Sequence, residues 1–463
     1  MATLVEARST GLSGPVAFGA GLLLFALAPI IRGGNRQVAM IGIEWLSILI
    51  LWLVALTWLR EADPADSHSA VLDLHLSEWL LVMSPIVAAL LQLSPLPVAL
   101  WSMLPGHGLY EHVLSSEWRP LTVTPDETRV SLMAGIPLVA AFLVARISSS
   151  KQIALLPPVL VLIAFVQAIW GLLQAGPFEG LYFGAEFAGS LIGSFANANH
   201  FANYIAMTLP LAVFVVYRSA PHRRLVGHQR TQWVAVLWLV VLLVLVTAVL
   251  ASGSRTGAAI GLMVTLVALL LALSAVSKAS RKWYGLGALA LVVAGLVVVG
   301  VNTLIVRFDA SRLGSDGNFR WMLVVSSWQA ALAFWPTGSG AGSYSAVYPA
   351  FEPPGVRGFA EHAHNDYVEL LMEFGFLFAL FAALIAGLVV RQARSLWHRI
   401  KHAGRDADAA HMQLCCGLGI LAIFLHSWVD FNLRIPANAI LCACLLGVYL
   451  RPIRYDKQSP ALE

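Results

Sequence analysis

The stretch WVAVLWLVVLLVLVTAVL, residues 233–250, contains no charged side chain and, as a helix, is long enough to nearly cross the ~30 Å hydrocarbon core of a bilayer. Similar apolar stretches recur along almost the whole chain, separated by short polar or basic segments. Hydrophobic residues make up 59% of the 463 residues and charged residues only 12%, which excludes an ordinary soluble globular protein. Because a backbone in lipid must satisfy its own hydrogen bonds, the sequence predicts an all-α, polytopic membrane protein.

Hydropathy predicts about twelve membrane-spanning helices within a single membrane domain, residues 1–463. The predicted helices are residues 15–31, 39–59, 79–101, 130–147, 153–174, 201–217, 233–250, 256–276, 285–305, 367–390, 413–430 and 436–450. Two external loops are long, residues 102–129 and residues 306–365. The second is rich in glycine and proline, and we expect it to contain short helices joined by irregular backbone. The four cysteines lie within apolar runs and are expected to pack as small core side chains.

Basic residues follow four of the predicted helices, those ending at residues 217, 276, 390 and 450. With twelve helices, all four basic segments lie on one side of the membrane, which the positive-inside rule assigns to the cytoplasm. Both chain ends are therefore expected to be cytoplasmic, although Arg32 and Arg36 fall on the other side. This placement accounts for the net charge of +4 without a nucleic-acid partner.

Polar residues beside or within the spans are costly unless they are paired or hydrated, so their positions are informative. The segment GSFANANHFANYIAM, residues 193–207, places four hydrogen-bonding side chains at one helix start: Asn197, Asn199, His200 and Asn203. Their donors and acceptors suit sugar hydroxyls. Helix capping and interhelical hydrogen bonds are the alternative interpretation.

Two further segments supply arginines at the same face. In ASGSRTGAAIG, residues 251–261, Arg255 begins a helix among hydroxyl side chains, an arrangement that binds phosphate, although a snorkelling arginine is the alternative. In residues 318–344, apolar spacing predicts an amphipathic helix along the membrane interface, with Arg320 near its start. The glycine-rich turn at its end is expected to be a tight connection.

The segment EHAHNDYVELLMEFG, residues 361–375, joins the long loop to an apolar run. Asp366 is predicted to cap the helix with Glu369 as its capping-box partner. His364 would then precede the positive end of the helix dipole, which favours a neutral imidazole able to take a proton from a hydroxyl. Glu373 shares a face with Glu369 and would lie within the membrane, where it needs a cation such as Arg255 or Arg320.

Other interpretations of these histidines remain open. His362 and His364 could be two zinc ligands, but the chain shows no third ligand at a diagnostic spacing, and both could also be structural caps. In a fifth polar segment, HSWVDFNLRIPAN, residues 426–438, Asp430 and Arg434 are spaced to pair if the segment is helical, which favours a structural role.

Together these segments resemble the O-antigen ligase and Wzy-type polymerase superfamily. HNDYVELLMEFGFLF resembles its histidine and amide motif, and GSFANANHFANY, SGSRTG, NFRWMLVVSSW with PTGSGAGSY, and HSWVDFNLRIPAN resemble other parts of the pattern. The resemblance covers roughly residues 190–440. It implies a metal-independent, inverting glycosyltransferase without a cofactor, with about twelve spans and a large periplasmic loop before the motif helix.

The resemblance also implies partners and residue roles. The donor would be an undecaprenyl diphosphate-linked glycan, the acceptor a glycan or lipid A-core, and the site the periplasmic face of the bacterial inner membrane. His364 would be the base or acceptor-orienting residue, and Arg255 and Arg320 would bind the diphosphate. The predicted substrate-binding residues are Asn197, Asn199, His200, Asn203, His362, Asn365, Glu369 and Glu373.

Several outcomes remain open within this prediction. The enzyme could polymerise repeat units, ligate finished polymer or glycosylate protein, and we favour a polymerase or ligase of surface polysaccharide (O-antigen, capsule or exopolysaccharide) because no added soluble domain is visible. A polytopic secondary transporter or lipid-linked glycan flippase is the alternative from another class. Transporters place charges near the bilayer midplane, whereas here the polar segments gather at one face.

Overall fold

A computed structural model describes residues 13–61, 74–112, 116–174, 191–219, 228–274, 310–354, 359–402 and 407–452. Among these residues, eight helices are long and apolar enough to cross a membrane, and three further apolar helices are shorter. These helices overlap eleven of the twelve predicted segments. The remaining one, residues 285–305, lies outside the described residues, so the number twelve stays a prediction.

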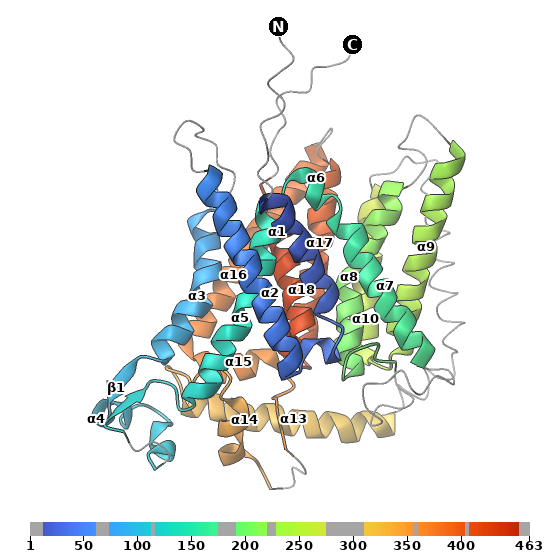
Figure 1. Cartoon of the computed structure of the whole chain (residues 1–463). Coiled ribbons are helices and arrows are strands. Elements are labelled where there is room, and N and C mark those ends of the chain that lie inside the picture. Colours follow the sequence, from blue (N-terminus) through green and yellow to red (C-terminus); the bar gives the residue numbers. More distant parts are fainter. Residues whose placement is uncertain are drawn as a thin grey trace.

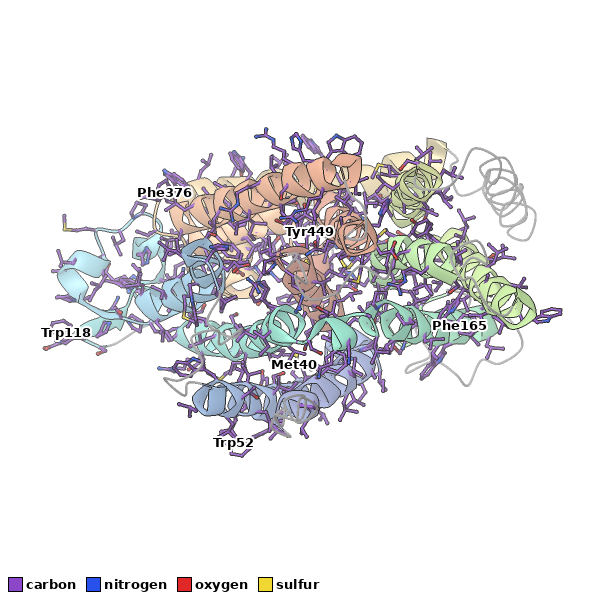
Figure 2. The ribbon with its side chains drawn as sticks, turned by 90° about the horizontal axis from the view of Figure 1, so that it is seen from above. Met40, Trp52, Trp118, Phe165, Phe376 and Tyr449 are labelled. Atoms are coloured by element: carbon purple, nitrogen blue, oxygen red, sulfur yellow. The ribbon has the colours of Figure 1, made fainter. Side chains whose placement is uncertain are left out.

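The apolar helices form an upright bundle (Figure 1). They are α1 (Ser13–Leu27), α2 (Gln37–Glu61), α3 (Leu76–Gln92), α5 (Pro125–Ile147), α7 (Leu156–Gln174), α8 (Ala198–Ser219), α9 (His228–Ala251), α10 (Arg255–Ser274), α16 (Phe376–His402), α17 (Ala407–His426) and α18 (Pro436–Tyr449). Short turns of helix, η1 (Arg32–Gly34) and α6 (Ser150–Ile153), lie between some of them. In the view along the bundle, Tyr449 lies inside while Trp52 points outward, as a lipid-facing side chain does (Figure 2).

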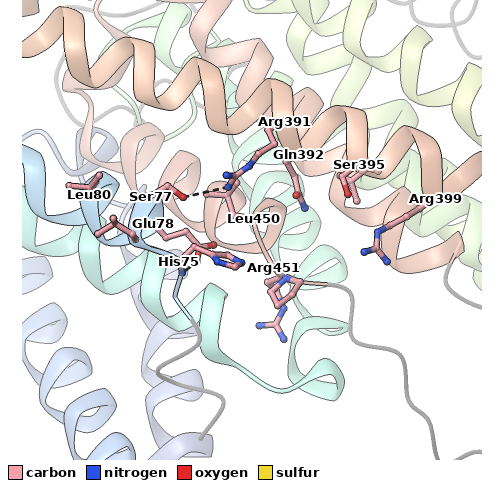
Figure 3. Close-up of a pocket in the computed structure, with 13 residues that line it drawn as sticks. His75, Ser77, Glu78, Leu80, Arg391, Gln392, Ser395, Arg399, Leu450 and Arg451 are labelled. Carbon is pink, nitrogen blue, oxygen red and sulfur yellow. Dashed lines mark hydrogen bonds between the residues drawn. The ribbon is translucent and has the colours of Figure 1, made fainter. Parts of the chain in front are cut away.

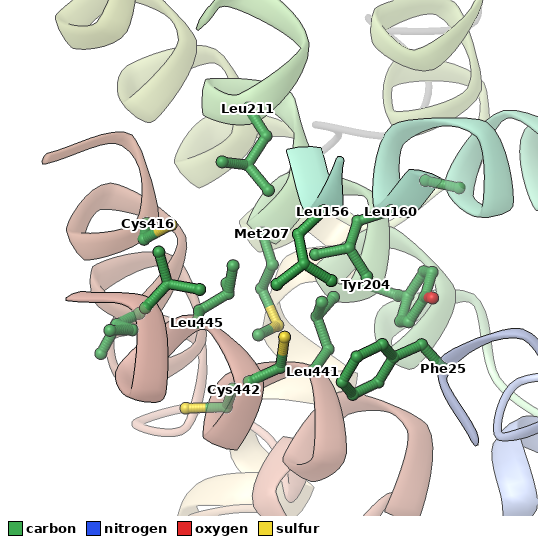
Figure 4. Close-up of a cluster of buried hydrophobic side chains, with 14 of the residues drawn as sticks. Phe25, Leu156, Leu160, Tyr204, Met207, Leu211, Cys416, Leu441, Cys442 and Leu445 are labelled. Carbon is green, nitrogen blue, oxygen red and sulfur yellow. The ribbon is translucent and has the colours of Figure 1, made fainter. Parts of the chain in front are cut away.

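The core of the bundle is built around α8, whose side chains are buried over nearly its whole length. Tyr204 and Met207 of α8 lie among leucines and Cys442 of α18 (Figure 4). All four cysteines are buried here as unpaired small side chains, as predicted: Cys415, Cys416, Cys442 and Cys444. Such packing gives the bundle a rigid centre from which the ends of its helices project.

A close approach between α10 and α8 fixes where α10 begins. A Cβ atom added to Gly257 would lie 2.5 Å from the Cβ of Ala202, so the first turns of these two helices touch through their smallest side chains. Arg255 and His200 precede these contacts by two residues on their own helices. The packing therefore brings both polar helix starts to one place.

A second layer runs across one end of the bundle (Figure 1). It contains α13 (Ala310–Ala333), α14 (Tyr344–Val347), η6 (Tyr348–Phe351) and α15 (Asp366–Phe374), and we call this end the α13 end. Leu323 and Ala330 of α13 are buried while Trp321 and Trp328 are exposed, as predicted for an amphipathic helix. The helix begins at Ala310, earlier than predicted, so Arg320 lies near its middle and not near its start. The predicted turn follows it, with positive φ at each of its three glycines: Gly338, Gly340 and Gly342.

Strands β1 (Pro95–Pro97) and β2 (Trp118–Pro120) pair antiparallel beside this layer, together with α4 (Val98–Trp101) and η2 (His107–Tyr110). The fold is thus mostly helical but not strictly all-α, and the predicted span over residues 79–101 is too long. Because proline at 95 and 97 cannot continue a helical hydrogen-bond ladder, α3 ends at Gln92.

The predicted span over residues 367–390 is two helices. α15 ends at Phe374, and α16 begins at Phe376 after Gly375 adopts a φ of 54°. A Cβ atom at Gly375 would lie 2.1 Å from the carbonyl oxygen of Pro336, so only glycine fits this close approach. The break keeps α15 in the layer with α13 and leaves α16 as the membrane-spanning helix.

Candidate active site

The predicted polar segments meet at the α13 end of the bundle. Helices α8, α10 and α18 begin there, and α17 ends there (Figure 1). Residues 427–435 connect α17 to α18 through turns and one short helix, η7 (Asn432–Arg434). Two groups of charged side chains form around this connection.

The first group surrounds Asp430, whose side chain is 0% exposed. Its Oδ1 atom accepts from the backbone N–H of Phe431 at 3.0 Å and lies 3.0 Å from Nδ1 of His364. Its Oδ2 atom accepts from Nδ2 of Asn199 at 2.5 Å and lies 3.7 Å from Nη1 of Arg320. We call these four side chains, Asp430, His364, Asn199 and Arg320, the Asp430 network.

The charges and hydrogen bonds in this network keep Asp430 ionised. Burial raises the pKa of Asp430, but the hydrogen bond from His364 and the nearby His200, His364 and Arg320 outweigh it, so the net pKa lies below the ordinary value. An ionised carboxylate can only accept hydrogen bonds, so Nδ1 of His364 carries the proton that faces it. The neutral imidazole then has a free electron pair at Nε2.

His364 itself is held in an unusual conformation. Its φ is 49°, in the left-handed region that side chains other than glycine rarely adopt. Such strain persists only where the surroundings fix it, and it is concentrated at functional sites. The side chain is 24% exposed, so a substrate hydroxyl can reach the ring.

The two predicted arginines differ in how they relate to this network. Arg320, 38% exposed, donates from Nη1 to the carbonyl of Val429 at 3.0 Å and so presents its charge beside Asp430. Arg255 is the first residue of α10 and is half-buried at the same end of the bundle. Within the described ranges it makes no ion pair with an acidic side chain.

The residues predicted at the start of α8 divide into two kinds. Asn197 precedes the helix, and its side chain accepts from the backbone N–H of Asn199 at 2.8 Å, which is a helix cap. Asn199 reaches Asp430, as described. His200 and Asn203 are almost completely buried, which favours the interhelical interpretation for these two.

The ring of Phe431 lies among three histidines. Its centroid is 4.6 Å from that of His200, 4.3 Å from that of His362 and 5.0 Å from that of His364. His200 also places Nδ1 3.2 Å from Oδ1 of Asn432. Phe431 therefore spaces the imidazoles apart while its backbone N–H contacts Asp430.

The second group surrounds Arg434. Its Nη2 lies 2.5 Å from Oε2 of Glu373, and its Nε lies 3.1 Å from Oε1 of Glu369. Glu369 also lies 2.8 Å from Nδ1 of His362 and accepts from the backbone N–H of Ala363 at 2.9 Å. We call these four side chains, Arg434, Glu369, Glu373 and His362, the Arg434 network.

Mutual stabilisation of charge dominates the Arg434 network. Burial raises the pKa of Glu369, but His362 and Arg434 outweigh it and the net pKa is lowered. Burial lowers the pKa of His362, but Glu369 outweighs it and the net pKa is raised. The two carboxylates are almost completely buried and both are paired with Arg434, which favours a structural role for this network, although the side chain of His362 is 23% exposed.

Three predictions made around these residues are wrong. The cation that pairs with Glu373 is Arg434, not Arg255 or Arg320. Asp430 and Arg434 do not pair with each other, because residues 427–435 form turns rather than the continuous helix that would bring them together.

The third concerns the helix cap. Asn365 caps α15, its Oδ1 accepting from the N–H of Tyr367 at 3.0 Å and of Val368 at 3.2 Å. Asp366 is instead the first helical residue, buried, with Oδ2 accepting from the N–H of Leu433 at 2.9 Å. Asn365 also donates from Nδ2 to the carbonyl of Trp428 at 3.0 Å, which ties the cap to the segment after α17.

Asp430 and Arg434 are the central residues of the two networks, and the sequence interpretation missed their partners. Both lie in the polar segment of residues 426–438, which the sequence analysis identified. Their four-residue spacing was interpreted there as an ion pair within one helix. The proline at 436 and the asparagine at 432 were available signals against a continuous helix there.

These features define a multi-pass helical membrane protein with a carboxylate–imidazole pair and an exposed arginine at one end of its bundle. Residues 239–384 match the family model described as O-antigen ligase, and this match supports membership of the chain in the O-antigen ligase family. The matched segment contains Arg255, Arg320 and His364, whereas Asp430 lies beyond it. No curated protein matches the chain. This match supports a ligase or polymerase type of role, with a lipid-linked glycan donor and a polysaccharide acceptor.

Proposed function

We propose that the protein is a metal-independent, inverting glycosyltransferase that moves a glycan from undecaprenyl diphosphate to an acceptor hydroxyl. The reaction takes place at the periplasmic face of the bacterial inner membrane and builds or attaches surface polysaccharide. The observation that carries the proposal is the contact between His364 and the buried carboxylate of Asp430, with the imidazole itself exposed beside Arg320.

The acceptor side of the reaction uses His364. Its Nε2 takes the proton of the acceptor hydroxyl while the hydroxyl oxygen bonds to the anomeric carbon of the donor sugar. A positioned base of this kind contributes roughly 10²- to 10⁴-fold in rate. Asp430 fixes the tautomer and stabilises the imidazolium that forms.

The donor side uses the arginines. As the new bond forms, the bond between the anomeric carbon and the diphosphate oxygen breaks, and negative charge grows on the departing undecaprenyl diphosphate. The guanidinium of Arg320 lies at the exposed edge of the Asp430 network, where it can bind that charge. Arg255 begins a helix at the same end, so the helix dipole adds to its attraction for phosphate.

The donor contacts are tested with purified protein and a defined lipid-linked glycan. Arg320→Ala is expected to weaken donor binding roughly 10- to 100-fold, the range for a lost hydrogen bond to a charged group, and Arg255→Ala is expected to weaken it as well. Arg129→Ala removes an arginine at the same end that is mostly exposed, and should leave donor binding unchanged. Normal donor affinity in both site variants would reject the diphosphate role.

The overall function is tested by gel analysis of surface polysaccharide in a strain that lacks the gene. Loss of all chain lengths beyond one repeat indicates a polymerase, and intact polymer retained on its lipid carrier indicates a ligase. Unchanged surface polysaccharide would contradict the proposal. Proteoliposomes that translocate the lipid-linked glycan without transferring it would show a flippase instead.

A further inference from the structure

A cavity of about 600 Å³ lies at the end of the bundle opposite the α13 end (Figure 3). It is bounded by the start of α3, the last turns of α16 and the residues that end and follow α18. None of the residues in the Asp430 and Arg434 networks lines it. The cavity is therefore separate from the candidate active site.

Arginines dominate the polar lining of this cavity. Arg391 and Arg399 project from one face of α16, two turns apart, with Ser395 between them (Figure 3). Arg391 lies 3.4 Å from the hydroxyl of Ser77 in the first turn of α3. Arg451 adds a third positive charge and is fixed by donating to the carbonyls of Ala145 and Arg146 at 3.0 and 2.8 Å.

The acidic side chain at the cavity is already neutralised. Among the described residues that line it, Glu78 is the only acid. Arg146 contacts both of its carboxylate oxygens at 2.9 Å, and both side chains are almost completely buried. Neither Arg391 nor Arg399 pairs with an acid in the part of the chain that the structure describes. The described residues that line the cavity thus carry a net positive charge.

The cavity lies at the level where phospholipid headgroups are expected. α3 begins at this end, and α16 and α18 end there, so its arginines mark the ends of helices that cross the apolar layer (Figure 1). Leu76 and Leu80 are exposed beside it on α3 and offer an apolar surface for acyl chains. Basic pockets between membrane helices in this position bind anionic lipid headgroups.

We propose that this cavity binds the phosphate group of an anionic glycerophospholipid from the leaflet opposite the candidate active site. The bound lipid would join α3, α16 and the segment that follows α18, because all three supply side chains to the cavity. The site is independent of glycan transfer, so its test does not depend on the proposed function.

The test uses the full chain purified in detergent and titrated with phosphatidylglycerol. Native mass spectrometry counts bound lipid, and thermal unfolding reports stabilisation. Wild-type protein is expected to retain phosphatidylglycerol in preference to zwitterionic phosphatidylcholine. The double variant Arg391→Gln/Arg399→Gln is expected to bind it roughly 10- to 30-fold more weakly, whereas Arg394→Gln, an exposed arginine of α16 outside the cavity, should bind normally.

A second variant tests whether the loss of lipid in the double variant results from misfolding. Ser395→Phe keeps every charge but fills the cavity, and it is expected to lose bound lipid while unfolding at the same temperature as lipid-free wild type. Equal retention of both lipids, or unchanged binding in the double variant and Ser395→Phe, would overturn the proposal. Inorganic phosphate that stabilises the protein as strongly and displaces the lipid would show a site for a soluble anion, which also overturns it.

Discussion

Asp430 and Arg434, the central residues of the two networks, are four positions apart in the chain. The networks differ in how completely their charges are paired. Arg434 is enclosed by Glu369 and Glu373, and Glu369 is also paired with His362. In the Asp430 network the single carboxylate is buried, and its cation Arg320, at 3.7 Å, is 38% exposed against 18% for Arg434. The two histidines do not differ in this respect, since the side chains of His364 and His362 are 24% and 23% exposed.

The difference indicates separate roles. A buried charge network whose members satisfy one another holds a structure in place, and removing one member leaves an uncompensated charge. The Asp430 network contains a histidine with a strained backbone and an arginine that is 38% exposed and only loosely paired, so it still has capacity to bind an anion and to transfer a proton. We therefore assign chemistry to the Asp430 network and stability to the Arg434 network.

The largest expected effect tests the first assignment. His364→Ala should lower glycan transfer in membranes by roughly 10²- to 10⁴-fold, because the acceptor hydroxyl loses its base, while protein abundance on immunoblots stays normal. His112→Ala, which removes an exposed histidine near the same end, should retain activity. Full activity in His364→Ala would remove this residue from the mechanism.

The next effect tests the second assignment. Arg434→Met should lower the free energy of unfolding by roughly 3–5 kcal/mol, because Glu369 and Glu373 stay buried without their cation. Thermal unfolding in detergent measures the change. Adding Glu369→Gln and Glu373→Gln to the same variant should restore much of the stability. A stable but inactive Arg434→Met protein would reverse the comparison.

Asp366 is buried, with Oδ2 accepting from the N–H of Leu433, and gives a pH-dependent effect. Burial raises the pKa of Asp366 from 3.8 to about 7, so between these values the folded chain keeps a proton that the unfolded chain releases. The stability from this group is complete below pH 3.8 and is lost as the pH rises to about 7. Asp366→Asn should remove this loss in the free energy of unfolding, which is on the order of a few kcal/mol. The variant should therefore become more stable relative to wild type as the pH rises. If Tm changed with pH in parallel for Asp366→Asn and wild type, the raised pKa of Asp366 would be contradicted.

The smallest effect concerns the helix cap at Asn365. Asn365→Ala should cost about 1 kcal/mol in unfolding free energy, since the first turn of α15 loses its acceptor. Asn365→Asp keeps the capping oxygen and should recover most of that loss. Thermal unfolding of the two variants measures the difference, and equal stability would show that the contact to Trp428 matters more than the cap.

Much of this site was predictable from the sequence. His364, Arg320 and Asn199 were identified because polar groups beside membrane spans are costly unless they are paired or hydrated. The structure brings all three to Asp430. The partner was not predictable, since His364 and Asp430 are 66 residues apart and local spacing suggested that Asp430 paired with Arg434.

The sequence by itself determined where most of the apolar helices lie, the amphipathic character of α13 and the gathering of polar segments at one end, because hydropathy and helical periodicity act locally along the chain. The tertiary structure alone decided which charges meet. The break at Gly375 and the turns between α17 and α18 set those pairs, and such turns depend on contacts with distant backbone, including the carbonyl of Pro336. Charge pairing follows from these long-range contacts, whereas local spacing alone pointed to the wrong partners.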